Sequence, residues 1–301
     1  TNSYITSGCA GSSCVAGSVS TATEQNYDNV LFSGALNVST SPKPYSTYST
    51  STANAGTIVD STNSVTFSMI NDGASEGGSN NVWILGQTGN PTITVPVGVY
   101  GVSDVYTMLN TELASAAFAN RDVTLFFNFG TTSNASTVQT VTVKLVNSNN
   151  STTAGGQVRN AVDCAPPSTS CGGVSTAASG SLLTSTVISG VTVKTNNVYT
   201  SPFTSATGSY VSNTSGTLNL DDQGFFFNGI SLSTLGTGAT NLNTYLVSIG
   251  VREAGTSPDI ASLGLSAITI DTVSAPEPST ILMLLTGLGA LAFARGRRIK
   301  A

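Results

Sequence analysis

The sequence contains no histidine and very few charged residues. Among its 301 residues there is not one His, and Asp, Glu, Lys and Arg together make up 8%, against about a quarter in ordinary soluble proteins. The absence of imidazole excludes Ser-His and Cys-His nucleophile systems, the commonest general base and the commonest transition-metal ligand. Carboxylates are therefore the remaining candidates for acid–base catalysis.

The few charges are distributed unevenly. The net charge is −5, but four of the ten basic residues lie among the last seven positions. Before residue 275 there are six basic and fourteen acidic residues, so this part carries −8. An acidic body argues against nucleic acid as a partner, because nucleic-acid binding requires a basic face.

Cysteine is also scarce, with four residues in two close pairs, Cys9/Cys14 and Cys164/Cys171. Without histidine a zinc site would need all four thiolates, and the second pair, with six residues between its cysteines, lacks the usual C-x2-4-C spacing. We predict two local disulfides, which indicate an oxidising compartment. The sequence begins with Thr1 rather than Met, so we expect that a signal peptide has been removed.

Short runs of alternating apolar residues recur between clusters of Gly, Asn, Ser and Pro, which is the pattern of β-strands. The sequence is 39% hydrophobic, enough for a core. We predict an all-β fold, an antiparallel β-sandwich of jelly-roll type spanning residues 26–274. A Ser/Thr-rich segment, residues 1–25, precedes it, and a polar insertion interrupts it at 147–181. The predicted strands are residues 29–38, 64–70, 81–86, 92–97, 122–129, 140–146, 186–195, 224–232, 245–251 and 266–271.

One stretch, SDVYTMLNTELASAAFA at residues 103–119, has apolar residues at helical spacing. Ser103 suits an N-cap, so we predict one short helix of about three turns that starts there. The same patterns predict which side chains are buried and which face solvent. We expect burial of Leu109, Leu113, Phe127, Val143 and Ile270, and exposure of Thr142 and Lys144.

The chain ends with three features in succession. Pro276-Glu277-Pro278 is followed by an apolar run, Ile281–Ala294, and then by a basic cluster. The prolines keep the first part extended, and long cationic side chains at the end allow a short apolar helix to span a membrane. The positive-inside rule leaves the basic end in the cytoplasm and the body outside. A C-terminal core helix is the alternative.

This arrangement resembles the PEP-CTERM sorting signal that exosortases recognise, and the resemblance covers residues 275–301. It implies export across the inner membrane of a Gram-negative bacterium, transient tethering by a transmembrane helix, and cleavage by an exosortase near Pro278. Delivery to the cell surface or to an exopolysaccharide matrix would follow. The anchor comprises Ile281, Leu282, Leu284, Leu285, Leu288, Leu291, Phe293, Arg295, Arg297 and Arg298.

Candidates for chemistry in the body are few. Asp221 and Asp222 open the sequence DDQG, which predicts a turn before a strand at Phe225; Glu253, Asp259 and Asp271 could supply a partner carboxylate, but no pattern selects one. No cofactor is predicted, although a structural calcium ion held at strand ends stays an open alternative. Tyr45 and Tyr48, in the sequence SPKPYSTYST, are the candidates for stacking on a sugar.

Three classes of function follow. We favour a non-enzymatic surface or extracellular-matrix protein of a biofilm. A carbohydrate-binding module for cell-surface polysaccharide is the second class, and a polysaccharide hydrolase or lyase is the third. Binding to polysaccharide beads distinguishes the second class from the first, and release of sugar identifies the third.

Overall fold

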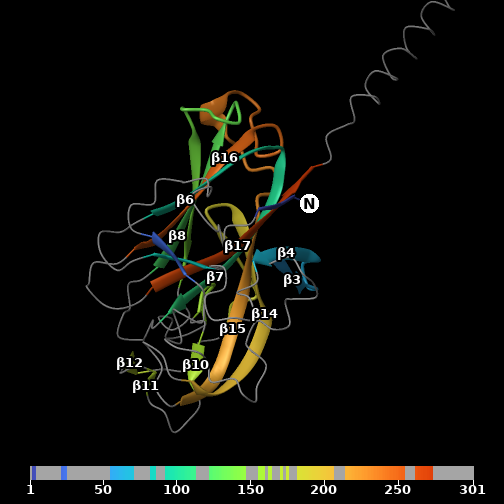
Figure 1. Cartoon of the computed structure of the whole chain (residues 1–301). Helices are drawn as coiled ribbons and strands as arrows, with labels where there is room; N and C mark the ends of the chain where they lie inside the picture. The colour runs from blue at the N-terminus through green and yellow to red at the C-terminus, as the bar shows by residue number, and fades with distance from the viewer. Residues whose placement is uncertain are drawn as a thin grey trace, which may run out of the picture.

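The structure is a computed structural model of the whole chain (Figure 1). It describes residues 2–4, 22–25, 55–70, 82–85, 92–112, 122–146, 155–159, 162–164, 170–171, 174–175, 182–206, 214–254 and 262–273. Within these, side chains are described for residues 59–67, 92–111, 123–146, 155–159, 182–198, 219–252 and 263–273.

The described chain is built almost entirely of β-strands, with one 3₁₀ turn at Ser233–Leu235. The strands before the polar insertion are β1 Asn2–Tyr4, β2 Ala22–Gln25, β3 Ala55–Asp60, β4 Val65–Ile70, β5 Val82–Leu85, β6 Thr92–Tyr100, β7 Val102–Glu112, β8 Asp122–Gly130 and β9 Gln139–Leu145. The remaining strands are β10 Val162–Cys164, β11 Ser170–Cys171, β12 Val174–Ser175, β13 Ser185–Ile188, β14 Val191–Ala206, β15 Thr214–Phe226, β16 Tyr245–Ala254 and β17 Ser262–Thr272.

Two antiparallel sheets form the main body. The larger has the strand order β13-β14-β15-β7-β17-β5-β2, with β1 paired to β17 and β10 paired to β15. The smaller has the order β6-β16-β8-β9. In Figure 1, β6, β8 and β16 lie to one side of β7 and β17. The all-β, antiparallel prediction is confirmed, whereas the jelly-roll path stays a prediction.

A single hydrophobic core lies between the two sheets, because one cluster of buried side chains draws on both. Phe127 of β8 stands at its centre, with its ring 5.0 Å from the rings of both Phe225 and Phe227, which come from the larger sheet and the residue just after it. Edge-to-face and tilted contacts of this kind add to the stabilisation from burial. Strand β9 shows the expected alternation: Val141, Val143 and Leu145 are buried, and Thr142 and Lys144 are exposed.

The β3–β4 hairpin covers part of the opposite face of the larger sheet. Val65 and Phe67 of the hairpin and Met108 of β7 are buried but do not belong to the main core. The Thr269 hydroxyl of β17 donates to the Thr66 carbonyl across 3.1 Å. Figure 1 shows the hairpin beside β17 and β14, away from the smaller sheet. The central strands of the larger sheet are therefore covered on both faces.

The predicted helix at residues 103–119 is wrong, because residues 102–112 form strand β7. This strand is central, pairing with β15 on one edge and with β17 on the other. It is covered on both faces, so Tyr106, Thr107, Met108 and Leu109 are all buried and the polar-apolar alternation of a half-exposed strand is lost. Without that alternation, the apolar residues of the strand recur three and four positions apart, which is the spacing typical of a helix.

The other predictions divide according to where they lie. The burial of Leu109, Phe127, Val143 and Ile270 is confirmed. The predicted strand at 186–195 is two strands, β13 and β14, joined by a tight turn in which Ser189 and Gly190 both have positive φ.

Two short pieces of the N-terminal segment at 1–25 form strands: β1 pairs with β17, and β2 pairs with β5. Leu113 and residues 29–38 lie outside the described residues.

Candidate functional site

Asp221 and Asp222 lie in the middle of β15 rather than in a turn, which corrects the prediction from the sequence DDQG. Both side chains are fully buried. Successive side chains of a strand point to opposite faces of the sheet, so the two carboxylates serve two different environments. Buried carboxylates need partners because an unpaired buried charge is costly, and each of these two has its own set.

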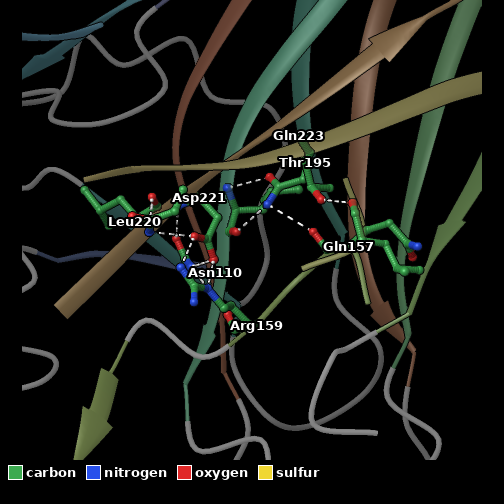
Figure 2. A network of polar contacts seen from close by, with 10 residues as sticks. Asn110, Gln157, Arg159, Thr195, Leu220, Asp221 and Gln223 are labelled. Atoms are coloured by element: carbon green, nitrogen blue, oxygen red, sulfur yellow. Dashed lines mark hydrogen bonds and ion pairs between the residues drawn. The ribbon is translucent and has the colours of Figure 1, made fainter. Parts of the chain in front are cut away.

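Asp221 forms a two-pronged ion pair with Arg159, which belongs to the polar insertion (Figure 2). Arg159 Nε donates to Asp221 Oδ2 and a terminal guanidinium nitrogen donates to Oδ1, each across 2.8 Å. The side-chain amides of Asn110 and Asn197 donate to the same carboxylate, each across 3.0 Å. Arg159 is 15% exposed and Asp221 is not exposed at all, so this is a mostly buried ion pair with its acceptor positions well used.

Gln223, two residues further along β15, anchors the same insertion from the core side (Figure 2). Its side-chain oxygen accepts from the Leu109 amide across 2.9 Å, and its nitrogen donates to the carbonyls of Leu109 and Gln157 across 2.9 and 3.3 Å. Gln157 in turn accepts from the Val146 amide across 2.8 Å. Residues 155–159 are thus fixed to β15, to β7 and to the end of β9 by polar contacts.

Asp222 faces the β3–β4 hairpin and lies against Asp60, the last residue of β3. The two carboxylates lie close enough for each to shift the pKa of the other. The side-chain amide of Asn63 donates to both, across 2.7 Å to Asp60 and 3.1 Å to Asp222. Asp60 also accepts from the Thr62 amide across 2.9 Å and from the Asn196 side chain across 2.7 Å. Two carboxylates are thus buried together.

The surroundings move the pKa values of these two groups in opposite directions. Burial, followed by the hydrogen bond to Asp60, raises the pKa of Asp222 well above its usual range. For Asp60, burial alone would raise the pKa, but the hydrogen bonds from Asp222, Thr62, Asn196 and Asn63 outweigh it and the net shift is downward. Of the two carboxyl groups, Asp222 is therefore the one that keeps its proton to the higher pH.

A second carboxylate pair lies on the same face of the larger sheet. Asp104 of β7 and Asp271 of β17 are directly opposite each other. Burial, with the charge of Asp271 adding to it, raises the pKa of Asp104, while Ser103 and Lys194 act against this. Tyr106 lies between the two pairs, and burial together with the four aspartates raises the pKa of its phenol.

The residues singled out from the sequence are placed differently. Asp271 belongs to the second pair, and Glu253 lies in β16. Asp259, Tyr45, Tyr48, Cys9 and Cys14 lie outside the described residues, as do the sorting signal and the anchor. Cys164 and Cys171 lie in β10 and β11 but their side chains are not described, so both disulfides stay predictions. Among the described residues no three His, Cys, Asp or Glu side chains form a metal-binding group.

Sequence analysis missed Asp60, Asn63 and Arg159. The run Asp60-Ser61-Thr62-Asn63 carries a usable signal, since an Asp that accepts from the amide two residues on is typical of turns. Nothing local indicates that Asp60 meets Asp222, 162 positions later, or that Arg159 meets Asp221. The site is produced by pairing between distant strands.

Comparison with known proteins locates one feature. Residues 274–298 match the PEP-CTERM protein-sorting motif. No curated protein and no solved structure matches the chain. Within the described residues no helix is long and apolar enough to cross a membrane, and the apolar run at 281–294 lies outside them. The motif marks an exported protein that an exosortase processes, with transient membrane anchoring and sorting to the cell surface.

Proposed function

We propose that this chain, with its PEP-CTERM sorting motif, is a non-enzymatic surface or extracellular-matrix protein of a Gram-negative bacterium. Its tail tethers it to the inner membrane until an exosortase cuts near Pro278, and the body then associates with exopolysaccharide in a biofilm. The observation that carries the proposal is the position of the motif, which starts at residue 274, two positions after the end of β17 at Thr272.

The state of the carboxylates supports the non-enzymatic part. Asp221 and Asp222 are fully buried and Asp60 is 1% exposed. A glycosidase needs two carboxyl groups on either side of a substrate-binding space, whereas Asp60 and Asp222 touch each other and Asp221 is occupied by Arg159. These groups attach segments of the chain to the larger sheet. Their positions are explained by folding alone.

The outer face of the smaller sheet supports association with a hydrated polymer. Asn128 of β8 donates to Ser248 across 3.0 Å and accepts from Thr140 across 2.7 Å, which forms a row of polar groups across three strands. The Arg252 guanidinium lies over the Phe126 ring, 4.8 Å from its centre. Such a face offers many hydroxyl, amide and cationic groups for weak hydrogen bonds to sugars.

One observation favours the second candidate, a carbohydrate-binding module. Tyr100 of β6 is 48% exposed and its ring lies 5.1 Å from that of Tyr245, the residue opposite it on β16. Exposed tyrosines can stack on a sugar ring. This pair, rather than Tyr45 and Tyr48, is the best-placed aromatic site in the described chain.

The processing step is tested by mass spectrometry of the protein recovered from the cell surface. We expect peptides up to the region of Pro278 and none from the apolar run onward. A strain without exosortase, and a Pro276→Ala/Pro278→Ala variant, should both retain the tail. Abundant surface protein with Lys300 still attached in the native strain would contradict the proposal.

Association with polysaccharide is tested by sedimentation of the body with the host's own exopolysaccharide. Tyr100→Ala distinguishes the two binding candidates, and Val187→Ala, which alters a 68% exposed apolar residue on the other sheet, is the matched control. A loss confined to Tyr100→Ala indicates a sugar-binding module. Equal binding by the wild type and both variants supports a diffuse contact with the polysaccharide. If none of the three proteins binds, the association is refuted. Release of sugar during the incubation would establish a hydrolase or lyase.

A further inference from the structure

The β3–β4 hairpin is attached to the larger sheet in two ways. Along β4, Val65 and Phe67 pack over the sheet and are almost completely buried. At the turn, the attachment is polar and depends on Asp60 and Asn63 from the hairpin and on Asp222 from the sheet. The polar attachment is the part that responds to solution conditions.

The hydrogen-bond donors favour a negative charge on Asp60 rather than on Asp222. Asp60 accepts from the Thr62 amide, the Asn63 amide, the Asn63 side chain and the Asn196 side chain, at distances of 2.7 to 3.3 Å. Asp222 accepts from the Asn63 side chain only, and its Oδ1 is buried without a conventional donor. Four donors stabilise an anion at Asp60, and a buried oxygen lacking a donor at Asp222 suits a protonated carboxyl that itself donates to Asp60.

Among the described residues, no cation close to the pair takes the place of the proton. Arg159 is bound to Asp221, and Lys194 lies 4.6 Å from the centre of the Phe226 ring further along the face. Strand β4 carries no charged residue. The charged and titratable groups that lie on the same face as the pair are Tyr106 and Asp104 on β7, Asp271 on β17 and Lys194 on β14. Asp221, next to Asp222 on β15, points to the opposite face, and its charge also raises the pKa of Asp222.

We propose that the hairpin is a pH-operated latch: one proton shared by Asp60 and Asp222 holds it on the larger sheet, and loss of that proton releases it. Without the proton, two negative charges would lie in contact in a buried site, and their repulsion favours separation into water. Release uncovers the apolar face around Met108. An exported protein is exposed directly to the pH of its surroundings. The latch would therefore make the exposure of this apolar face depend on the external pH.

The direction of the effect follows from linkage. Once opened, Asp222 titrates near its model value of 3.8, whereas in the closed state its pKa is raised. Between these two values opening releases one proton, so the opening equilibrium rises about tenfold per pH unit. Above the closed-state pKa it levels off. Asp60, whose pKa is lowered in the closed state, adds no slope at pH values well above its model value of 3.8.

Hydrogen–deuterium exchange on the full-length chain in mild detergent tests the latch. Exchange of residues 55–70, corrected for the intrinsic pH dependence of amide exchange, is measured from pH 4 to pH 9, with β8 in the main core as the internal reference. We expect the corrected opening of the hairpin to increase about tenfold per pH unit until it levels off. The corrected exchange of the β8 amides should not show this increase with pH.

Three variants separate the latch from general destabilisation. Asp222→Asn keeps a donor facing Asp60 and cannot ionise, so the hairpin should stay closed at every pH. Asp60→Asn keeps one acceptor oxygen and replaces the other with an amide donor, so two of the four donors lose their acceptor and the hairpin should be more open than in the wild type at pH 4. Asp104→Asn alters a partly buried carboxyl on the same face and should keep the wild-type slope. A flat wild-type profile, an unchanged slope in Asp222→Asn, or a flat profile in Asp104→Asn would each overturn the proposal.

Discussion

Replacing Arg159 with methionine should destabilise the protein severely. The change leaves the Asp221 carboxylate fully buried with only the Asn110 and Asn197 amides as side-chain donors. Breaking a buried ion pair from one side costs about 3–5 kcal/mol, because the remaining charge stays desolvated. Methionine retains most of the aliphatic volume of arginine, so little of this cost comes from lost packing.

The partner variant and the double variant make the reasoning testable. Asp221→Asn alone should cost less, about 1–3 kcal/mol, because Arg159 is 15% exposed and its guanidinium can turn toward water. Once Asp221 is neutral, the arginine has no buried charge to compensate, so Arg159→Met should add little. The double variant is therefore expected to be more stable than Arg159→Met by itself.

Urea unfolding followed by far-ultraviolet circular dichroism gives the four free energies of unfolding. The coupling energy between the two positions should exceed about 1 kcal/mol. A cost below about 1 kcal/mol for Arg159→Met, or free energies that simply add in the double variant, would refute the role given to this ion pair. Equal slopes of free energy against urea concentration serve as the control for an unchanged two-state transition.

Three further predictions concern packing and charge. Gly224→Ala should cost about 1–3 kcal/mol in urea unfolding, because a Cβ there would lie 3.0 Å from the Phe226 ring and 3.1 Å from the Tyr106 ring; a neutral result would mean that both rings can shift freely. Phe127→Ala should cost about 3–5 kcal/mol, while Val187→Ala, at a 68% exposed position, should change stability by less than about 0.5 kcal/mol. Asp104→Asn should raise the melting temperature at pH 7 but not at pH 3, because burial raises the pKa of Asp104 and its ionisation above pH 4 therefore opposes folding; the same gain at both pH values would contradict this.

The sequence allows prediction of those strands that have one face in the core and one in water. β9 is the clearest case, because exposed polar and buried apolar residues alternate along its sequence, as in Thr142, Val143 and Lys144. β7 could not be predicted in this way, because its outer face is covered by a hairpin that lies about 40 residues earlier in the chain. A strand buried on both faces lacks alternation, and local spacing then suggests a helix.

The candidate site was hidden for a related reason. Asp221-Asp222 followed by Gln and Gly is a good turn sequence when it is read locally, yet three neighbours supplied from elsewhere make it a buried strand. Arg159 forms an ion pair with Asp221, Asp60 lies beside Asp222 with Asn63 donating to both, and Asn110 adds a further donor to Asp221. Each of these partners is more than 60 positions away in the sequence, so no local pattern could identify them. The tail, by contrast, was readable because a sorting signal is recognised as a linear sequence.

The position of β17 has a mechanical consequence. The chain leaves the body at Val273, one residue after β17, and Val273 is itself held by a 2.9 Å hydrogen bond to the Gly101 carbonyl. β17 is no edge strand, since it pairs with β7 along one side and with β5 and β1 along the other. Tension on the tail pulls along this strand, so the hydrogen bonds on both sides share the force instead of opening one after another. While tethered, the body should resist being pulled apart, and only Ser274 and Ala275 separate Val273 from the Pro-Glu-Pro.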